Sequence, residues 1–379
     1  MDGKMTYSIE IQQSSLWDKL KDKRAPLSFN IEVTARCNNA CRHCYINLPE
    51  DDSAAKELEL RVAEIGDIAE QAVKLGAMWC LITGGEPLIR PDFPEIYLML
   101  KRKGLLVSLF TNATMVNQGH VELFKKYPPW DVEVTVYGIT RETYERVTRK
   151  LGSFDMFMNG LNMLMNNGVR VRLKSMAIRF NLAEHGAIAE FCRKLTKDNY
   201  RFDPQIHMRY DGDPMRNSEI NAERLIPQEV VALERAGEKR MKSIQQNCST
   251  LINNKFTHKE CDHLFHCGAG NWIFNVGYDG KFRLCSSLCQ ANTVYDLRKG
   301  KLTDAWFNFS PSVLDMRSHR KEYLETCRRC PIVNLCLWCP AHAHLETGAL
   351  DGTTPYFCQV AHARADSLIS RKQLGDPYY

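Results

Sequence analysis

The sequence contains no long hydrophobic run, and this absence excludes one class of protein. None of its apolar stretches approaches the roughly 20 residues that a helix needs to cross a bilayer. No secretory signal precedes the first charged residues of the 379-residue chain. We therefore expect a cytoplasmic protein with no membrane partner.

The chain also lacks a large excess of either charge. Fifty Lys and Arg stand against 45 Asp and Glu, so the net charge is only +5. The basic residues are interspersed with acidic ones, and a nucleic-acid partner is therefore not expected. The sequence has no internal repeat or low-complexity tract, and its 44% hydrophobic content is ordinary for a globular protein.

Cysteine, by contrast, is abundant. The chain has 15 cysteines, and without a secretory signal these predict metal or redox chemistry rather than disulfides. Cys37, Cys41 and Cys44 are spaced C-x3-C-x2-C just after an apolar, strand-like run. Three thiolates can ligate three irons of a four-iron cluster and leave the fourth iron open to another ligand. A zinc site or a disulfide is the alternative interpretation of this motif.

A second motif follows the apolar run 79–82 and has the sequence Thr-Gly-Gly-Glu-Pro, with Gly84, Gly85 and Glu86 at its centre. Glycines let the backbone approach a ligand closely, and a carboxylate suits an ammonium group. An ordinary turn between a strand and a helix is the alternative. In this order the two motifs resemble the radical S-adenosylmethionine (SAM) superfamily.

That resemblance implies a cofactor and a reaction. The amino and carboxylate groups of SAM would bind the open iron, and Gly84, Gly85 and Glu86 would grip the amino group. The reduced cluster would pass one electron to SAM, which would split into methionine and a 5′-deoxyadenosyl radical that abstracts hydrogen from a substrate. A flavodoxin- or ferredoxin-type protein would donate the electron.

The last third of the chain holds a second group of cysteines. Its core is C-x2-C-x5-C-x2-C, and it resembles the SPASM domain, which holds two auxiliary four-iron clusters. The usual spacing has three residues between the last pair, and this chain has two. The resemblance implies Cys261, Cys267, Cys285 and Cys339 as ligands of the first auxiliary cluster, and Cys327, Cys330, Cys336 and Cys358 as ligands of the second. With the SAM cluster this makes three 4Fe-4S clusters.

Two alternatives remain for these C-terminal cysteines. Cys289 is a spare thiol close to the first set, and it is a candidate replacement for one of its ligands. A double zinc ribbon would use the same pattern of close cysteine pairs. Cys80, Cys192 and Cys248 have no such companions and are expected to be buried apolar residues.

Between the two cysteine regions, strand-like and helix-like segments alternate, which is typical of a βα barrel. The candidate strands are 29–34, 78–82, 105–111, 132–137, 169–177 and 205–210. We expect an α/β fold in which a partial (β/α)6 TIM-like barrel precedes a small cysteine-rich SPASM domain. The expected divisions are an N-terminal extension at 1–26, the barrel at 27–212, a linker with a helix at 213–260, the SPASM domain at 261–365 and a C-terminal tail at 366–379.

The carboxyl ends of barrel strands nominate further residues, because catalytic groups collect there. Asn112 follows the third strand and Thr135 lies on the fourth, so both are candidates to contact SAM. Arg146 or Arg149 would pair a guanidinium with the SAM carboxylate, although solvated helix charges are the favoured alternative for both residues. Lys174 and Ser175 are expected near the site, and substrate is expected near 209–213. The sequence assigns no catalytic acid or base.

The resemblance implies a mechanism but allows several substrates. We expect a radical SAM oxidoreductase, or maturase, that modifies a ribosomally synthesised peptide, for example by an oxidative crosslink. Residues 1–24 leave no room for a winged-helix leader-recognition domain, so a separate protein would recognise the leader. The alternatives are a small-molecule radical dehydrogenase or an enzyme that modifies tetrapyrrole side chains. A protein of another class, a non-catalytic zinc or electron-carrier protein, would also use many cysteines.

Overall fold

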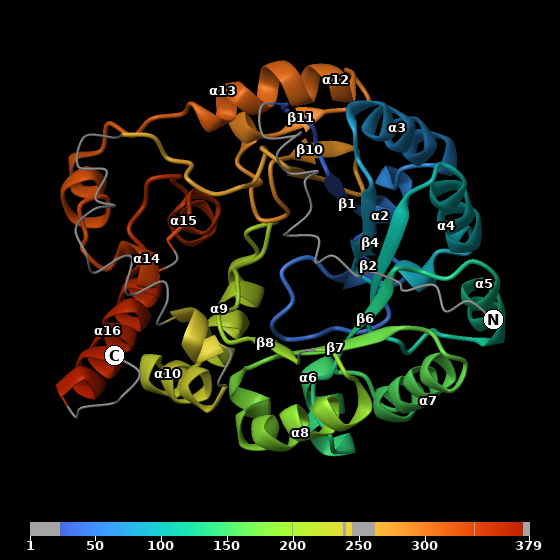
Figure 1. Cartoon of the computed structure of the whole chain (residues 1–379), viewed down its shortest axis with the longest axis horizontal. Helices are drawn as coiled ribbons and strands as arrows, with labels where there is room; N and C mark the ends of the chain where they lie inside the picture. Colours follow the sequence, from blue (N-terminus) through green and yellow to red (C-terminus); the bar gives the residue numbers. More distant parts are fainter. Residues whose placement is uncertain (1–22, 199, 238–239, 245–261, 337, 374–379) are drawn as a thin grey trace, which may run out of the picture.

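A single nine-stranded sheet organises the protein (Figure 1). The computed structural model describes residues 23–373 except 199, 238–239, 245–261 and 337. The strand order is β11-β10-β9-β1-β4-β5-β6-β7-β8. Six neighbouring strands run parallel: β1 Ser28–Thr34, β4 Trp79–Gly84, β5 Leu106–Thr111, β6 Asp131–Thr135, β7 Val171–Met176 and β8 Arg201–Asp203. These strands form the expected partial barrel.

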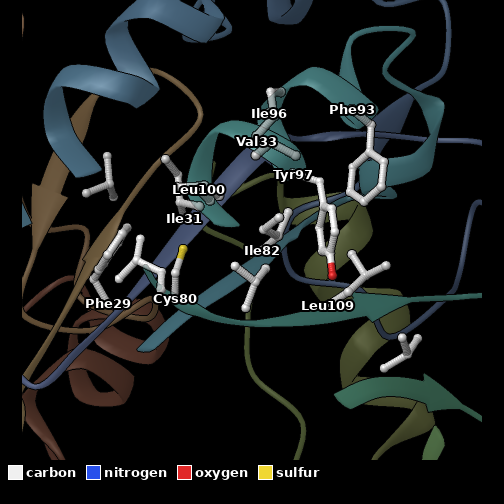
Figure 2. Close-up of a cluster of buried hydrophobic side chains, with 14 of the residues drawn as sticks. Phe29, Ile31, Val33, Cys80, Ile82, Phe93, Ile96, Tyr97, Leu100 and Leu109 are labelled. Carbon is white, nitrogen blue, oxygen red and sulfur yellow. The ribbon is translucent and has the colours of Figure 1, made fainter. Parts of the chain in front are cut away.

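Helices cover the outer face of the barrel strands (Figure 1). The covering helices are α3 Val62–Leu75, α4 Phe93–Arg102, α5 Gln118–Lys126, α6 Arg141–Thr148, α7 Ser153–Asn166 and α8 His185–Leu195. Successive residues of a strand point to opposite faces. Phe29, Ile31 and Val33 of β1 are therefore fully buried in the core shared with α4, as Figure 2 shows. Cys80 belongs to this core and Cys192 is also fully buried, as expected for apolar residues.

The sixth strand differs from the sequence-based expectation. It is β8, at 201–203, and not the segment 205–210. Pro204 follows β8 directly and has no N–H to continue the ladder of hydrogen bonds. The apolar alternation that suggested a strand arises because Ile206 and Met208 pack into a separate buried cluster with Ile220 of α9.

The C-terminal region extends the barrel sheet. Strand β9 (Ile273–Val276) pairs parallel with β1, and Ser28 lies opposite Ile273. Strand β10 (Lys281–Arg283) then pairs antiparallel with β9 across a turn that contains Asp279 and Gly280, and β11 (Tyr295–Asp296) pairs antiparallel with β10. The sheet is therefore continuous between the segments 27–212 and 261–365.

The helices after the barrel gather beside its open edge. Helices α9 (Pro214–Glu223) and α10 (Pro227–Ala236) follow β8, and the residues 240–244 are helical again beyond Gly237. The linker at 213–260, for which one helix was expected, therefore contains several helical segments among its described residues. Helix α10 packs on α16 (Pro355–Gln373), which also packs on α14 (Val333–Cys336). Helix α15 (Pro340–Thr347) lies between α14 and α16 in sequence.

The remaining elements are short. They are β2 Arg36–Cys37, β3 Leu48–Pro49, α2 Ser53–Leu58, η2 Pro87–Ile89, η3 Arg179–Glu184, η5 Ala291–Thr293, α12 Leu302–Asp304, η6 Ala305–Phe309, α13 Ser310–Leu314 and η7 Tyr323–Cys327. No helix within the described residues has both the length and the apolar character that crossing a membrane would need.

Candidate active site

A cavity of about 590 Å³ lies at the carboxyl ends of the barrel strands. We call it the barrel cavity. Its wall comes from the loop that carries the first three cysteines, from the ends of β4 to β8, and from two residues of the C-terminal region. The lining residues used below are Cys37, Cys41, Cys44, Gly84, Gly85, Asn112, Thr135, Lys174, Asp203, His207, Arg240 and His342.

The three cysteines of the first motif line this cavity together, and burial affects the thiols of Cys37 and Cys41. Burial raises the pKa of Cys41 to about 12, and the nearby Cys44 thiol raises it further. Burial also raises the pKa of Cys37 well above its usual range, with Cys41 the next cause. Thiolates at this place therefore require a compensating positive charge, which iron would supply. The cysteine set thus fits an iron-sulfur cluster.

Hydrogen bonds to the main chain hold the loop that carries these cysteines. The amide of Ala40 donates to the carbonyl of Thr148 at 2.9 Å, and the amide of Arg42 donates to the carbonyl of Val147 at 3.2 Å. The guanidinium of Arg209 donates to the Cys44 carbonyl at 3.3 Å. Arg209 supports the loop in this way and is almost fully buried. The segment 209–213, where substrate was expected, does not line the barrel cavity, and the preceding residues 203–207 line it instead.

The glycine motif packs against the end of β1. A methyl group added to Gly84 would meet the carbonyl oxygen of Thr34 at 2.1 Å, and one added to Gly85 would meet that of Arg36 at 2.2 Å. Gly84 also has a positive φ of 140°. Only glycine fits at these two positions. The backbone at both glycines faces the barrel cavity.

Glu86 lies behind the glycines and does not line the cavity. Its carboxylate accepts hydrogen bonds from the amides of Leu88 (3.0 Å) and Asn112 (2.7 Å) and from the hydroxyl of Thr111 (2.7 Å). Burial raises its pKa to about 7, although these three donors oppose the shift. The sequence suggested direct contact with a ligand, but both oxygens are occupied by the ends of β4 and β5. Glu86 therefore shapes the wall from behind.

Asn112 and Thr135 reach the cavity, as the barrel rule predicts. The side-chain amide of Asn112 donates to the side-chain oxygen of Asn38 at 3.0 Å and lies 3.8 Å from the Cys37 sulfur. Its oxygen accepts a hydrogen bond from the Thr114 amide at 2.8 Å. Asn112 is thus held rigidly beside the first cysteine. Thr135 contributes from the last position of β6.

The two arginines suggested for SAM lie elsewhere. The guanidinium of Arg146 stacks on the ring of Phe180 at 4.1 Å, and Arg149 pairs with Glu219 at 2.7 Å. Arg146 is an exposed residue of α6 and Arg149 directly follows that helix, and neither lines the barrel cavity. The lysine and arginine that do line it are Lys174 and Arg240.

Lys174 lies on β7 with its side chain directed inward. Its ammonium pairs with Glu133 at 2.7 Å and lies 3.9 Å from the centre of the Phe110 ring. Burial lowers its pKa, and Glu133 opposes that shift. Ser175, the next residue, points to the opposite face and hydrogen bonds with Tyr200 outside the cavity. The alternation of β7 therefore separates two residues that the sequence placed together.

Two histidines close the cavity from the C-terminal side. The ring centroids of His207 and His342 lie 3.9 Å apart. Burial lowers the pKa of His207 to about 4 and that of His342 to about 3. The spacing of His342 and His344 gives no sign in the sequence that His342 lines this cavity. The signal was missing because the contact joins the segment after β8 to α15, far apart in the chain.

The expected ligands of the second auxiliary cluster line a cavity of their own. This auxiliary cavity has a volume of about 310 Å³, and its wall includes Cys327, Cys330, Cys336 and Cys358. Burial raises the pKa of Cys336 to about 12, and the other three thiols raise it further. The remaining wall is largely apolar, with residues such as Ile332. Four thiols around one largely apolar cavity suit an iron-sulfur cluster.

The expected first auxiliary set is described in part. Burial raises the pKa of Cys285 to about 12, followed by the effects of Cys339 and Cys267. These three thiols are therefore neighbours, whereas Cys261 falls outside the described residues. Cys289 instead has Arg283 and Glu32 as its charged neighbours. Within the described parts of the chain, no three His, Cys, Asp or Glu side chains form a site for a single metal ion.

Comparison with known proteins gives matches over most of the chain. Residues 31–192 match the family model described as the radical SAM superfamily. Fe-coproporphyrin III synthase of Methanosarcina barkeri is 24% identical over 340 residues, which are 83% of this chain and 83% of that protein. The subtilosin biosynthesis protein AlbA of Bacillus subtilis is 27% identical over 45% of this chain. The match spans only 37% of AlbA, and a match to a probable GTP 3′,8-cyclase of Methanocaldococcus jannaschii, 29% identical over 46% of this chain, spans 59% of that protein.

Solved structures give the same fold. SuiB of Streptococcus suis bound to S-adenosylmethionine has a TM-score of 0.63 and 16% identity, and it covers 90% of this chain and 80% of its own. SuiB bound to its precursor peptide SuiA gives a TM-score of 0.63 at 15% identity, with coverage of 91% and 78%. At these identities the likeness describes the arrangement of helices and strands alone.

Proposed function

We propose that this chain, whose residues 31–192 match the family model of the radical SAM superfamily, is a radical SAM enzyme that modifies a ribosomally synthesised peptide. The observation that carries the proposal is the barrel cavity. Three cysteines, two glycines that admit no side chain, and the polar ends of β5 and β6 meet around one space of about 590 Å³. This space is large enough for a cofactor with part of a substrate beside it.

We propose that Cys37, Cys41 and Cys44 ligate a 4Fe-4S cluster whose open iron binds SAM. When bound and reduced, this pair supplies a 5′-deoxyadenosyl radical. The chain's own contribution is to bury the reacting atoms and to orient SAM. Gly84 and Gly85 would offer backbone groups to the amino group of SAM, and Asn112 and Thr135 would contact the rest of the molecule.

The carboxylate of SAM needs a cation, and Lys174 is our candidate. It lines the cavity, whereas Arg146 stacks on Phe180 at the surface. Because Glu133 already pairs with Lys174 at 2.7 Å, the ammonium is held in one position before any ligand binds. Preorganisation of this kind strengthens binding by reducing the entropy that is lost.

We further propose two auxiliary 4Fe-4S clusters in a SPASM domain. The four thiols around the auxiliary cavity would hold the second, and Cys267, Cys285 and Cys339 would hold the first together with Cys261. The auxiliary clusters would accept the electron that remains after hydrogen abstraction. Support comes from the effects of these thiols on one another's pKa values within each set.

The peptide substrate is proposed from the comparisons. AlbA takes part in the biosynthesis of a bacteriocin, and SuiB has been solved with a precursor peptide. We propose that this chain likewise acts on a peptide, and that a separate protein presents the leader of that peptide.

Anaerobic reconstitution tests the proposed function. Iron, sulfide and zinc are counted, and 5′-deoxyadenosine is assayed after dithionite is added with SAM. About twelve irons per chain, as three four-iron clusters require, and 5′-deoxyadenosine formation are expected. Zinc without iron, and SAM left intact, would identify a non-catalytic cysteine protein.

A tetrapyrrole substrate is the second candidate, and one observation favours it. The match to Fe-coproporphyrin III synthase covers 83% of both chains, whereas the match to AlbA covers less than half of this chain. Titration of iron coproporphyrin III with the reconstituted protein tests this candidate. A shift of the Soret band with saturable binding would favour the tetrapyrrole, and an unchanged spectrum would favour the peptide.

A further inference from the structure

Four arginines cluster on the outer side of the loop that holds the first three cysteines. We call this cluster the arginine patch and define it as Arg42, Arg146, Arg149 and Arg216. Arg42 lies within the cysteine loop itself, between Cys41 and Cys44. The other three come from the end of α6 and from α9. Elements from three parts of the chain therefore present the same charge at one place.

The contacts within the patch leave positive charge in excess. The guanidinium groups of Arg42 and Arg146 both stack on the ring of Phe180, at 4.5 Å and 4.1 Å. Arg42 lies 3.5 Å from a carboxylate oxygen of Glu223. Arg149 and Arg216 both pair with Glu219, at 2.7 Å and 3.3 Å. Four arginines thus share two carboxylates.

The excess faces outward. Glu223 is only 1% exposed, so its charge lies beneath the arginines. Arg146 and Arg149 are exposed. Beside the patch, Glu142 lies one helical turn before Arg146 on the same face and offsets one of its charges, whereas the exposed Lys150 adds one positive charge. The patch therefore presents a net positive surface to solvent.

The opposite end of the cysteine loop has the opposite charge. Residues 50–52 read Glu-Asp-Asp, and Glu50 and Asp51 are exposed. An acidic protein that approaches the cysteine loop is repelled at this end and attracted at the arginine patch. The charges at the two ends of the loop therefore favour one position for an acidic partner, at the arginine patch.

The patch also touches the main chain of the cysteine loop. The guanidinium of Arg216 donates to the carbonyl of Cys41 at 3.1 Å. The amide of Arg42 donates to the Val147 carbonyl at 3.2 Å, at the end of α6. A protein seated on the patch would therefore lie against the segments that directly contact Cys41, with no further layer of structure between.

We propose that the arginine patch is the docking surface for an acidic one-electron carrier protein of the flavodoxin or ferredoxin type. The inference rests on the proposed function, which needs one electron from outside for each SAM that is cleaved. One electron leaves the carrier and ends on the sulfonium of SAM. The carbon–sulfur bond to the 5′ carbon then breaks to give methionine and a 5′-deoxyadenosyl radical, and no proton moves in this step.

Charge attraction of this kind acts mainly on the rate of association. Opposite surface potentials steer encounter, and salt screens them within about 10 Å at 0.1 M. The rate with a protein carrier should therefore fall as salt is added. Dithionite is a small reductant that needs no docking surface, so its rate should depend far less on these arginines.

The test uses the full chain with its clusters reconstituted, and it measures 5′-deoxyadenosine formed from SAM. One series is driven by dithionite and the other by reduced flavodoxin at limiting concentration. The test variant is R149E/K150E, whose two positions are exposed and lie outside the cavity lining. The matched control is K194E/K299E, whose side chains are 72% and 85% exposed and which changes the net charge by the same amount.

We expect the flavodoxin-driven rate of R149E/K150E to fall by about tenfold at low salt, with its salt dependence flattened. Its dithionite-driven rate and both rates of the control should match the parent protein. An equal fall with both reductants, or an equal fall in the control, would overturn the docking proposal. The neutral variant R149Q/K150Q provides the same comparison if charge reversal prevents folding.

Two further outcomes separate this inference from the proposed function. If dithionite gives no 5′-deoxyadenosine with the parent protein, the proposed function fails and the docking inference falls with it. If R329E, beside Cys330, lowers only the flavodoxin-driven rate while R149E/K150E does not, the carrier docks at the C-terminal cysteines. That result would overturn the proposal that the carrier docks at the arginine patch, and it would leave the proposed enzyme function intact.

Discussion

The imidazole rings of His207 and His342 lie with their centroids 3.9 Å apart, and this contact joins the barrel to α15. Tilted and offset-stacked aromatic pairs stabilise by about 0.5–1.5 kcal/mol beyond their buried area. We predict a coupling energy in this range for the double-mutant cycle H207A, H342A and H207A/H342A, measured by denaturant unfolding. If the changes in unfolding free energy of the two single variants simply added in the double variant, the two histidines would not stabilise each other.

Replacing Cys37, Cys41 and Cys44 together with alanine should remove one cluster and all SAM cleavage. About four of twelve irons should be lost, because the C-terminal cysteines keep theirs. Iron analysis and the 5′-deoxyadenosine assay check this. Persistent SAM cleavage in the triple variant would show that these cysteines do not ligate the cluster that cleaves SAM.

The double variant C327A/C330A should lose the second auxiliary cluster and keep part of the SAM cleavage. About four irons should again be lost, since two of four ligands around the auxiliary cavity are missing. Cys289→Ser is the matched control, because Cys289 has Arg283 and Glu32 as neighbours and should leave the iron content unchanged. Loss of iron from the control would make Cys289 a ligand.

Gly85→Ala should destabilise the protein and abolish SAM binding. The added methyl group would meet the Arg36 carbonyl oxygen at 2.2 Å, and overpacking of this kind costs about 1–3 kcal/mol. Gly186→Ala on α8 is the control, because nothing lies within 4 Å of the added methyl. Alanine there should stabilise the helix by about 0.5–1 kcal/mol. Thermal unfolding and SAM binding by calorimetry compare the two.

His185 should make stability depend on pH. Burial lowers its folded-state pKa to about 4, with a smaller effect of Arg193, whereas an unfolded histidine titrates near about 6.5. The unfolded chain therefore binds the additional proton, and stability falls as pH drops from about 6.5 towards 4. His185→Phe should reduce this fall. Equal slopes of unfolding free energy against pH in both proteins would contradict the assignment.

Local sequence predicted the parts of this fold that local forces determine. The alternation of Phe29, Ile31 and Val33 marks β1 because one face of that strand is fully buried. The alternation of Ile206 and Met208 led to the wrong prediction of a strand at 205–210, because two buried residues of a loop give the same pattern without pairing in the sheet. Pro204 was the signal that could have separated the two cases.

The parts of the candidate site that depend only on the spacing of residues in the sequence could be predicted. Three closely spaced cysteines must lie near one another, and two adjacent glycines indicate a tight approach of backbone. The position of the Glu86 carboxylate could not be read in this way, because it depends on donors from Thr111 and Asn112 on the next strand. The same is true of His342, whose place in the cavity wall depends on how α15 packs.

The parallel pairing of β1 with β9 has a consequence for synthesis of the chain. During synthesis, β1 has no partner on its β9 side until Ile273, which lies opposite Ser28, has left the ribosome. Until then β1 is an edge strand with unpaired amides and carbonyls, which other chains can extend. Contacts between such distant residues also slow folding. We expect the nascent barrel to depend on a chaperone during this interval, and a fragment that stops at 212 to aggregate.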